Sequence, residues 1–181
     1  MNGIRLVGIG AGSTRAPRNR LTRLAQALSR MMHAEVRIHA GTLDASFARD
    51  DLRGQYYSTA LLQALQPFAG DSRVLGVTHL DLYVPVLTFV FGEAQLEGNC
   101  AVVSMHRLHE EFYGLPRHEE LLQERLLKES VHELGHTFGL RHCDNWQCVM
   151  ASSHAVEVLD IKGVEFCPRC GRAVFGRAGG T

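Results

Sequence analysis

The sequence lacks the features that direct a protein to a membrane or to nucleic acid. Its 19 Lys and Arg residues balance 19 Asp and Glu residues, so no overall field attracts a polyanion. No apolar run is long enough to span a bilayer, and no basic segment with a following apolar run and cleavage site opens the chain. We therefore expect a cytoplasmic protein that acts on a peptide or protein, with no nucleic-acid or membrane partner.

Cysteine is scarce outside one region. Of the five cysteines, four gather near the C-terminus around a cluster of histidines: Cys143, Cys148, Cys167 and Cys170. This clustering is typical of metal ligands in a reducing compartment and argues against the disulfide framework of a secreted protein. Cys100 stands apart in an apolar run, and we interpret it as a small buried hydrophobe.

The length of 181 residues suits one compact domain with a hydrophobic core. Apolar runs alternate with helical periodicities, which predicts an α/β (α+β) fold with a mixed, twisted sheet packed on helices. We expect Arg18, Arg20, Arg23 and Arg30 on the solvated face of the first helix, and a connection at 42–56. Strands are predicted at 4–9, 36–38, 74–78, 87–91 and 100–105, and helices at 17–32, 58–65 and 118–138.

The stretch 131–150 carries the most specific signal. His132 and His136 are four positions apart, so a helical turn places both imidazoles on one face, where they can share a metal ion. Glu133 projects from the same turn and can accept a proton from an activated water without being a ligand. Gly139 can end the helix in a left-handed conformation and return His142 to the metal.

Three histidines would leave the fourth position of a zinc ion open, which is the arrangement of catalytic sites. A structural site of three histidines needs a fourth protein ligand, and the neighbouring sequence offers none. We interpret His106, His109 and His118 as surface or packing residues, because the metal already has three well-spaced ligands.

The motif from His132 to His142, followed by Met150, resembles the metzincin zinc peptidases. The resemblance extends to the archaemetzincin family in the segments FVFGEAQ and KESVHELGHTFGL and in the cysteines after the third histidine. It implies a metzincin-like zincin domain that hydrolyses peptide bonds, with Glu133 as general base and Met150 in a turn beneath the zinc. It also implies an edge strand along the cleft, which we place at 87–91; the alternative is that 87–91 is a paired internal strand.

A second metal site is predicted beside the first. Adjacent side chains in an extended segment point to opposite sides, so His142 and Cys143 can face two different metals. The four clustered cysteines match a closed, structural zinc site, and CPRC at 167–170 has the spacing of a zinc knuckle. A redox Cys-x-x-Cys pair is the alternative, but such motifs open a helix after a strand. We expect two zinc ions per chain.

These predictions combine into one monomeric metallopeptidase domain over residues 1–181. Residues 1–139 would hold the sheet and the active-site helix, and residues 140–181 would form a zinc-stapled subdomain with the Met-turn. No tyrosine follows Met150 closely, so His154 is the nearest polar candidate for stabilising an oxyanion. The alternative function is a non-catalytic zinc-stapled binding module, but an intact Glu133 argues against it. A variant of this alternative would contact nucleic acid through Lys162, Arg169, Arg172 and Arg177.

Overall fold

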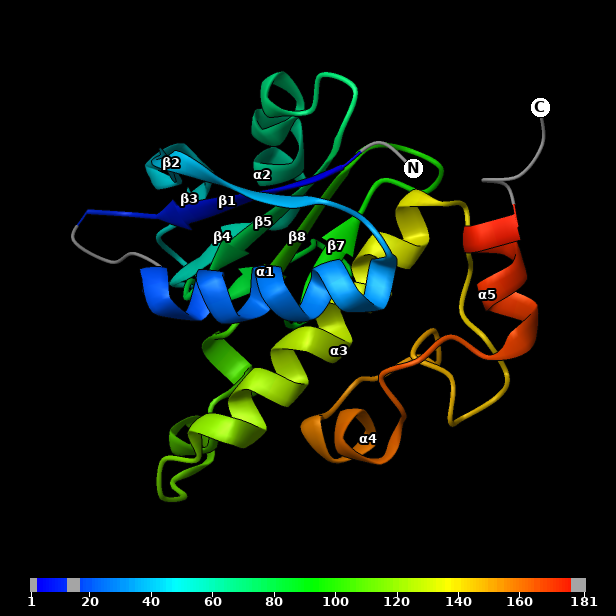
Figure 1. The fold of residues 1–181 in the computed structure, drawn as a ribbon. Helices are drawn as coiled ribbons and strands as arrows, with labels where there is room; N and C mark the ends of the chain where they lie inside the picture. The colour runs from blue at the N-terminus through cyan, green and yellow to red at the C-terminus, as the bar shows by residue number, and fades with distance from the viewer. Residues whose placement is uncertain (1–2, 13–16, 177–181) are drawn as a thin grey trace.

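The computed structural model describes residues 3–12 and 17–176, in which a five-stranded sheet carries helices on both faces (Figure 1). The strand order is β2-β1-β5-β8-β7. The first four strands run parallel, and β7 lies antiparallel to β8 at the edge. The bounds are β1 (Ile4–Gly10), β2 (Val36–Asp44), β5 (Arg73–Thr78), β7 (Gly92–Ala94) and β8 (Cys100–Ser104). The α/β fold expected from the alternating patterns is therefore confirmed.

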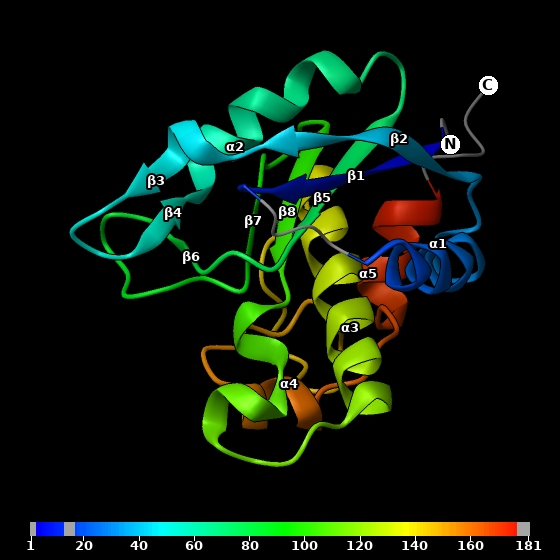
Figure 2. The same cartoon turned by 90° about the vertical axis from the view of Figure 1, so that its left-hand side faces the viewer.

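Helices cover both faces of this sheet, so its central strands are buried almost throughout instead of being buried at every second residue. Helices α1 (Arg18–Met32) and α3 (Glu119–Thr137) pack on one face, and α2 (Ser58–Leu65) packs on the other (Figure 2). All five residues of β8 are buried, including Cys100 at 1% exposure, as predicted. The sheet thus separates two hydrophobic clusters, and α3 lies along the larger one.

The first helix differs from its predicted pattern at one arginine. Arg20 was expected to face solvent, but its side chain is buried between α1 and α3. Its guanidinium donates two hydrogen bonds of 2.8 Å to the carboxylate of Glu119, the first residue of α3. The distant partner accounts for the burial, because a buried cation needs a paired anion.

The predicted connection at 42–56 contains regular structure. It includes the end of β2, the 3-10 turn η1 (Ser46–Ala48), and strand β3 (Arg49–Asp50). Strand β4 (Gln55–Tyr57) begins within it and pairs with β3 and with β6 (Leu82–Tyr83) in a small second sheet. These strands are two or three residues long, so they show no periodicity that a sequence pattern could reveal.

The prediction of a strand at 87–91 is wrong. Only one isolated bridge, between Val90 and Leu82, forms in this segment. The carbonyls of Leu87 and Thr88 instead accept hydrogen bonds from the side chain of Arg53, and Gln55 also donates to the Thr88 carbonyl. Side chains of β4 and its preceding turn therefore hold this apolar segment as a loop, and the edge strand next to it is β7.

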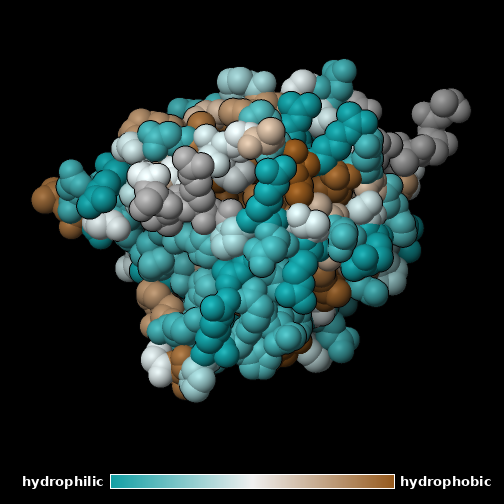
Figure 3. Space-filling view, turned by 60° about the vertical axis from the view of Figure 1, so that its left-hand side comes forward, coloured by the Kyte–Doolittle hydropathy of each residue, from teal (hydrophilic) through white to brown (hydrophobic). Residues whose placement is uncertain are grey.

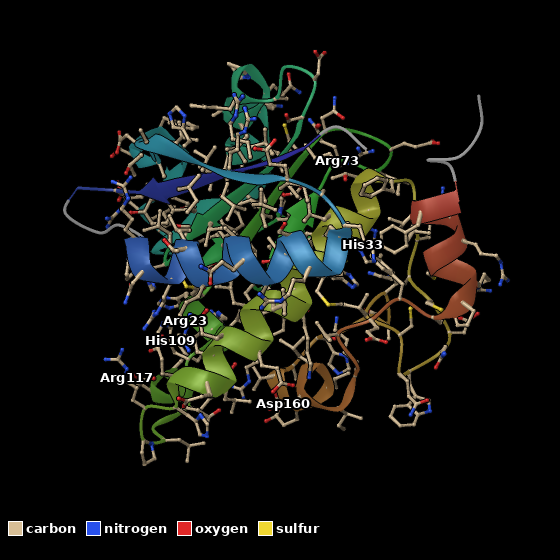
Figure 4. All side chains as sticks on the ribbon, viewed as in Figure 1. Arg23, His33, Arg73, His109, Arg117 and Asp160 are labelled. Atoms are coloured by element: carbon tan, nitrogen blue, oxygen red, sulfur yellow. The ribbon has the colours of Figure 1, made fainter. Side chains whose placement is uncertain are left out.

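The C-terminal segment follows α3 and returns along it. It carries α4 (Val156–Ile161) and α5 (Pro168–Phe175). Arg125 of α3 donates hydrogen bonds of 2.7 and 2.6 Å to Asp160 of α4, which lies on the side of α4 toward α3 (Figure 4). A further hydrogen bond joins Arg125 to the carbonyl of Leu108 in the 3-10 turn η3 (His106–Leu108). These contacts fix the C-terminal segment against the helix that carries the predicted metal ligands.

The face drawn in Figure 3 is mostly hydrophilic, and its hydrophobic residues form small, separate patches. None of the described helices is long and apolar enough to cross a membrane. The remaining 3-10 turns are η2 (Gln66–Phe68) and η4 (Glu110–Tyr113).

Candidate active site

Two of the predicted metal ligands lie in the last two turns of α3. The Nδ1 atom of His132 is 2.8 Å from the Val149 carbonyl, and that of His136 is 2.7 Å from the Leu140 carbonyl. A carbonyl oxygen only accepts, so each Nδ1 carries the hydrogen and each Nε2 is left as the ligand atom. The two Nε2 atoms lie 3.1 Å apart and face the same point.

The end of α3 returns the third histidine to this point. Gly139 has φ of 87°, and its N–H bonds the His136 carbonyl while the N–H of Leu140 bonds the Gly135 carbonyl. This pair of hydrogen bonds is the Schellman arrangement, which ends a helix through a left-handed glycine. The ring centroid of His142 then lies 5.3 Å from that of His132 and 5.2 Å from that of His136.

The three histidines fit a zinc ion. One ring nitrogen from each lies within 4.8 Å of the others, as a shared ion requires. Burial lowers the pKa of His132 well below its usual range, and the Lys162 ammonium lowers it further. Burial also lowers the pKa of His136. Both imidazoles are therefore neutral near pH 7, which is the form that binds metal.

Glu133 lies in a cavity of about 850 Å³ beside the three histidines. Residues 87–94 and residues 152–154 also line this cavity. The Glu133 side chain packs against β7, where a Cβ at Gly92 would lie 2.6 Å from Glu133 Cγ. Burial raises the pKa of the Glu133 carboxyl well above its usual range, and the neighbouring Glu129 carboxylate raises it further. A carboxyl in this environment is suited to take up a proton.

Met150 lies directly under the histidine helix. It is fully buried, and a Cβ at Gly135 would collide with its Sδ atom, so the two residues are in close contact. The N–H of Cys143 donates to the Met150 carbonyl at 2.9 Å. The turn carrying Met150 is thereby tied to the segment that carries His142.

The four clustered cysteines also meet. The sulfurs of Cys143, Cys148, Cys167 and Cys170 lie within 4.8 Å of one another. Cys167 caps the start of α5, so the last cysteine pair opens a helix rather than a loop knuckle. No strand of the described chain directly precedes it, in contrast to the redox motif. A hydrogen bond from the backbone of Cys170 lowers the pKa of the Cys167 thiol to about 7, which favours the ligand form.

Two buried charged residues beside the site were missed in the sequence. Lys162 is 2% exposed, and its Nζ lies 3.1 Å from Glu129 Oε1, 3.2 Å from the Ala151 carbonyl and 3.4 Å from His132 Nδ1. Glu129 stands one helical turn before Glu133, a spacing that could have placed it on the same face. Nothing in the sequence near Lys162 indicates its burial.

This burial changes the nucleic-acid hypothesis. Lys162 is enclosed and cannot contact a polyanion, so its assignment to such a surface is wrong. Arg169 donates to the Cys143 sulfur at 3.2 Å, and Arg172 is exposed. Arg177 lies outside the described residues.

The other candidate histidines take the places expected of them. His109 stacks on His79 with ring centroids 5.6 Å apart, and Nδ1 of His118 accepts a hydrogen bond from the Leu121 N–H at the start of α3. His109 and Arg117 lie near the end of α3 that is remote from the metal ligands (Figure 4). His154 is exposed and lines the cavity, where no tyrosine is present among the described lining residues.

Several known proteins are similar to this chain in both sequence and fold. The chain matches Peptidase family M54 over residues 30–175. It is 47% identical to the archaemetzincin of Methanocaldococcus jannaschii over 124 residues, 68% of this chain and 68% of that protein. Crystalline archaemetzincin from Archaeoglobus fulgidus, complexed with malonate, has a TM-score of 0.81 and 37% identity over 94% of this chain and 99% of that one. Archaemetzincin from Methanopyrus kandleri has a TM-score of 0.81 and 38% identity over 98% of this chain and 95% of that one.

Proposed function

Because this chain belongs to peptidase family M54, the archaemetzincins, and is a zinc metallopeptidase, we propose that Glu133 is its general base. We further propose that His132, His136 and His142 hold the zinc ion. The convergence of three imidazoles beside a buried carboxyl is the observation that supports this assignment. A zinc ion bound there supplies a Lewis acid that polarises a carbonyl and lowers the pKa of water.

The roles of the chain's own residues follow from their positions. The Glu133 carboxylate takes the proton of the attacking water and passes it to the leaving amine, as its raised pKa allows. The carbonyls of Val149 and Leu140 keep the ligand nitrogens of His132 and His136 pointed at a common centre. Met150 packs tightly against Gly135 of α3, and this contact limits movement of the helix that carries His132 and His136.

The edge strand β7 is suited to hold an extended substrate. Among the described strands, β7 pairs only with β8, and its residues Gly92, Glu93 and Ala94 line the cavity. A peptide can complete such an edge through backbone hydrogen bonds, which give affinity with little dependence on sequence. We propose that the substrate lies along β7 with its scissile bond above Glu133.

The general-base assignment predicts that Glu133→Gln abolishes cleavage while zinc stays bound. Glutamine keeps the size of the side chain but cannot take the proton, so kcat/KM should fall by about 10² to 10⁴-fold. Mass spectrometry of a diverse peptide pool, incubated with the parent and the variant at equal zinc content, measures this. Glu120→Gln, an exposed position of α3, is the matched control. Equal cleavage by parent and Glu133→Gln would refute the assignment.

The same experiment tests the alternative function. A zinc-stapled binding module would bind zinc and give no cleavage with either protein. Three histidine ligands leave the fourth position of a zinc ion open, and a general base beside that position serves no purpose in a binding module. We therefore favour the peptidase.

We propose a second, structural zinc ion at Cys143, Cys148, Cys167 and Cys170, which would pin the C-terminal segment to the loop that carries His142. Residues 1–139 and 140–181 would then form the two subdomains of one domain. Cys148→Ser should then lower the zinc content from about two ions per chain to about one and lower the melting temperature, since metal binding contributes to folding. Elemental analysis and thermal unfolding measure these effects. Cys100→Ser, which removes a buried thiol outside the cluster, should keep both ions. Two ions retained in Cys148→Ser would contradict the proposal.

A further inference from the structure

The buried Glu129, which pairs with Lys162, lines the cavity beside the three histidines. Glu129 lines the cavity although it is only 4% exposed, so its carboxylate lies at the bottom of the cavity rather than at the rim. Lys162 Nζ bonds its Oε1 atom at 3.1 Å. The other oxygen, Oε2, has no hydrogen bond among the described residues. One face of this carboxylate is thus occupied and the other is open to a ligand.

Lys162 fixes the position of this carboxylate. Its ammonium also donates to the Ala151 carbonyl at 3.2 Å, so it joins α3 to the segment directly after Met150. An ammonium carries three donors, and two of them are held by these acceptors inside the protein. The Glu129 carboxylate is therefore held rigidly, as a specificity-determining group must be.

A second polar group lines the same cavity without a partner. The Ser153 hydroxyl is buried, and among the described residues it has no hydrogen-bond partner. Ser153 lies two positions after Ala151, on the segment that Lys162 ties to α3. A buried hydroxyl without a partner is costly in a native protein, and a ligand group that bonds it removes the cost.

We propose that Glu129 and Ser153 form a polar subsite for the substrate side chain next to the scissile bond. This inference rests on the proposed peptidase function and adds the class of substrate. The open carboxylate oxygen only accepts, so it selects a side chain that donates, such as that of lysine or glutamine. An apolar side chain leaves both groups unpaired, and an acidic one is repelled by the Glu129 carboxylate.

Two pairs of peptides of matched shape test this subsite. The first pair carries lysine or norleucine at one of the two positions that flank the cleaved bond. The second pair carries glutamine or glutamate at that position. The parent should cleave the lysine peptide about ten- to a hundredfold better than the norleucine peptide, in kcat/KM, at one flanking position. It should prefer glutamine to glutamate at the same position.

Variants then assign the preference to the proposed residues. Glu129→Gln should reduce the ratio of kcat/KM for lysine over norleucine by about tenfold, and Glu120→Gln should leave this ratio unchanged. Ser153→Ala keeps the ion pair intact, so it tests the subsite even if Glu129→Gln does not fold; it should reduce the preference for glutamine.

The outcomes separate this inference from the function on which it rests. A ratio near one at both flanking positions in the parent, or an undiminished preference in Glu129→Gln and Ser153→Ala, would overturn the subsite and leave the peptidase in place. Absence of any cleavage that depends on Glu133 would overturn the proposed base, and the subsite with it.

Discussion

At the scale of single residues, Gly92 sets how closely the edge strand approaches Glu133. A Cβ at this position would lie 2.6 Å from Glu133 Cγ and 2.7 Å from the Val102 carbonyl oxygen. Contacts this short are not tolerated, so either β7 or the Glu133 side chain would have to move. Position 92 therefore accepts only glycine if Glu133 is to keep its place.

Gly92→Ala is expected to lower kcat/KM by at least about tenfold, because a displacement of about 1 Å in a catalytic group costs up to about a hundredfold. Zinc content should be unchanged, since the atoms nearest to a Cβ at position 92 belong to Glu133 and Val102 and not to a proposed ligand. Steady-state kinetics with elemental analysis measures both. Gly8→Ala is the control, because a Cβ there meets only Leu21 Cδ1 at an ordinary 3.6 Å. Full activity in Gly92→Ala would show that Glu133 does not depend on this contact.

Single residues also show what the sequence could and could not predict. The convergence of His132, His136 and His142 could be predicted because their spacing and a helix-ending glycine determine it locally. Arg20 and Lys162 could not be placed, because their partners Glu119 and Glu129 lie 99 and 33 positions away. Burial of a charge depends on such distant pairing, which a local pattern does not contain.

At the scale of elements, α3 is the best predicted part of the chain and the segment 87–91 the worst. Helix α3 runs over 19 residues, long enough for its periodicity and its end signals to agree. The apolar run at 87–91 has the composition of a strand, yet the Arg53 and Gln55 side chains bond its carbonyls. Tertiary contacts therefore override the local β preference there.

The C-terminal end of helix α3 sets the position of the proposed zinc ligand His142. Gly139→Ala is expected to destabilise the protein by about 1–2 kcal/mol, because the left-handed conformation is unfavourable for alanine. It should also weaken zinc binding, since a Cβ there would lie 2.9 Å from Glu97 Cγ and shift the segment leading to His142. Urea unfolding and zinc titration against a competing chelator measure the two effects.

The matched control for this change is Gly114→Ala. Gly114 has φ of 76°, and a Cβ there would meet nothing within 4 Å. It should show a similar loss of stability with zinc affinity unchanged. If both variants bind zinc as the parent does, the end of α3 does not control the position of His142.

At the scale of the whole molecule, two groups of contacts hold the C-terminal segment to the sheet and its helices. Arg125 of α3 bonds Asp160 and also pairs with Glu110 at 2.6 Å. Lys128 donates to the carbonyls of Leu159 and Asp160. These contacts and the cysteine cluster each join the chain before Met150 to the chain after it. Loss of either should therefore loosen the same C-terminal segment, which makes unfolding cooperative.

Acid should weaken the whole fold through His79, a half-buried histidine that stacks on His109. Burial, and to a smaller extent the charge of the stacked His109 ring, lower the pKa of His79 from 6.5 to about 4. The fold thus favours neutral His79. Its contribution is fully present above pH 6.5, the value of the unfolded chain, and is lost as the pH falls toward 4.

This loss should amount to about 2–3 kcal/mol of unfolding free energy between pH 7 and pH 4.5. His79→Gln has no proton to take up, so it should lose less stability than the parent over the same range. Urea unfolding of both proteins at the two pH values, with equal zinc, measures the difference, because protonation of the metal ligands contributes equally to both. If parent and variant lose the same free energy, His79 is protonated as readily in the folded protein as in the unfolded chain.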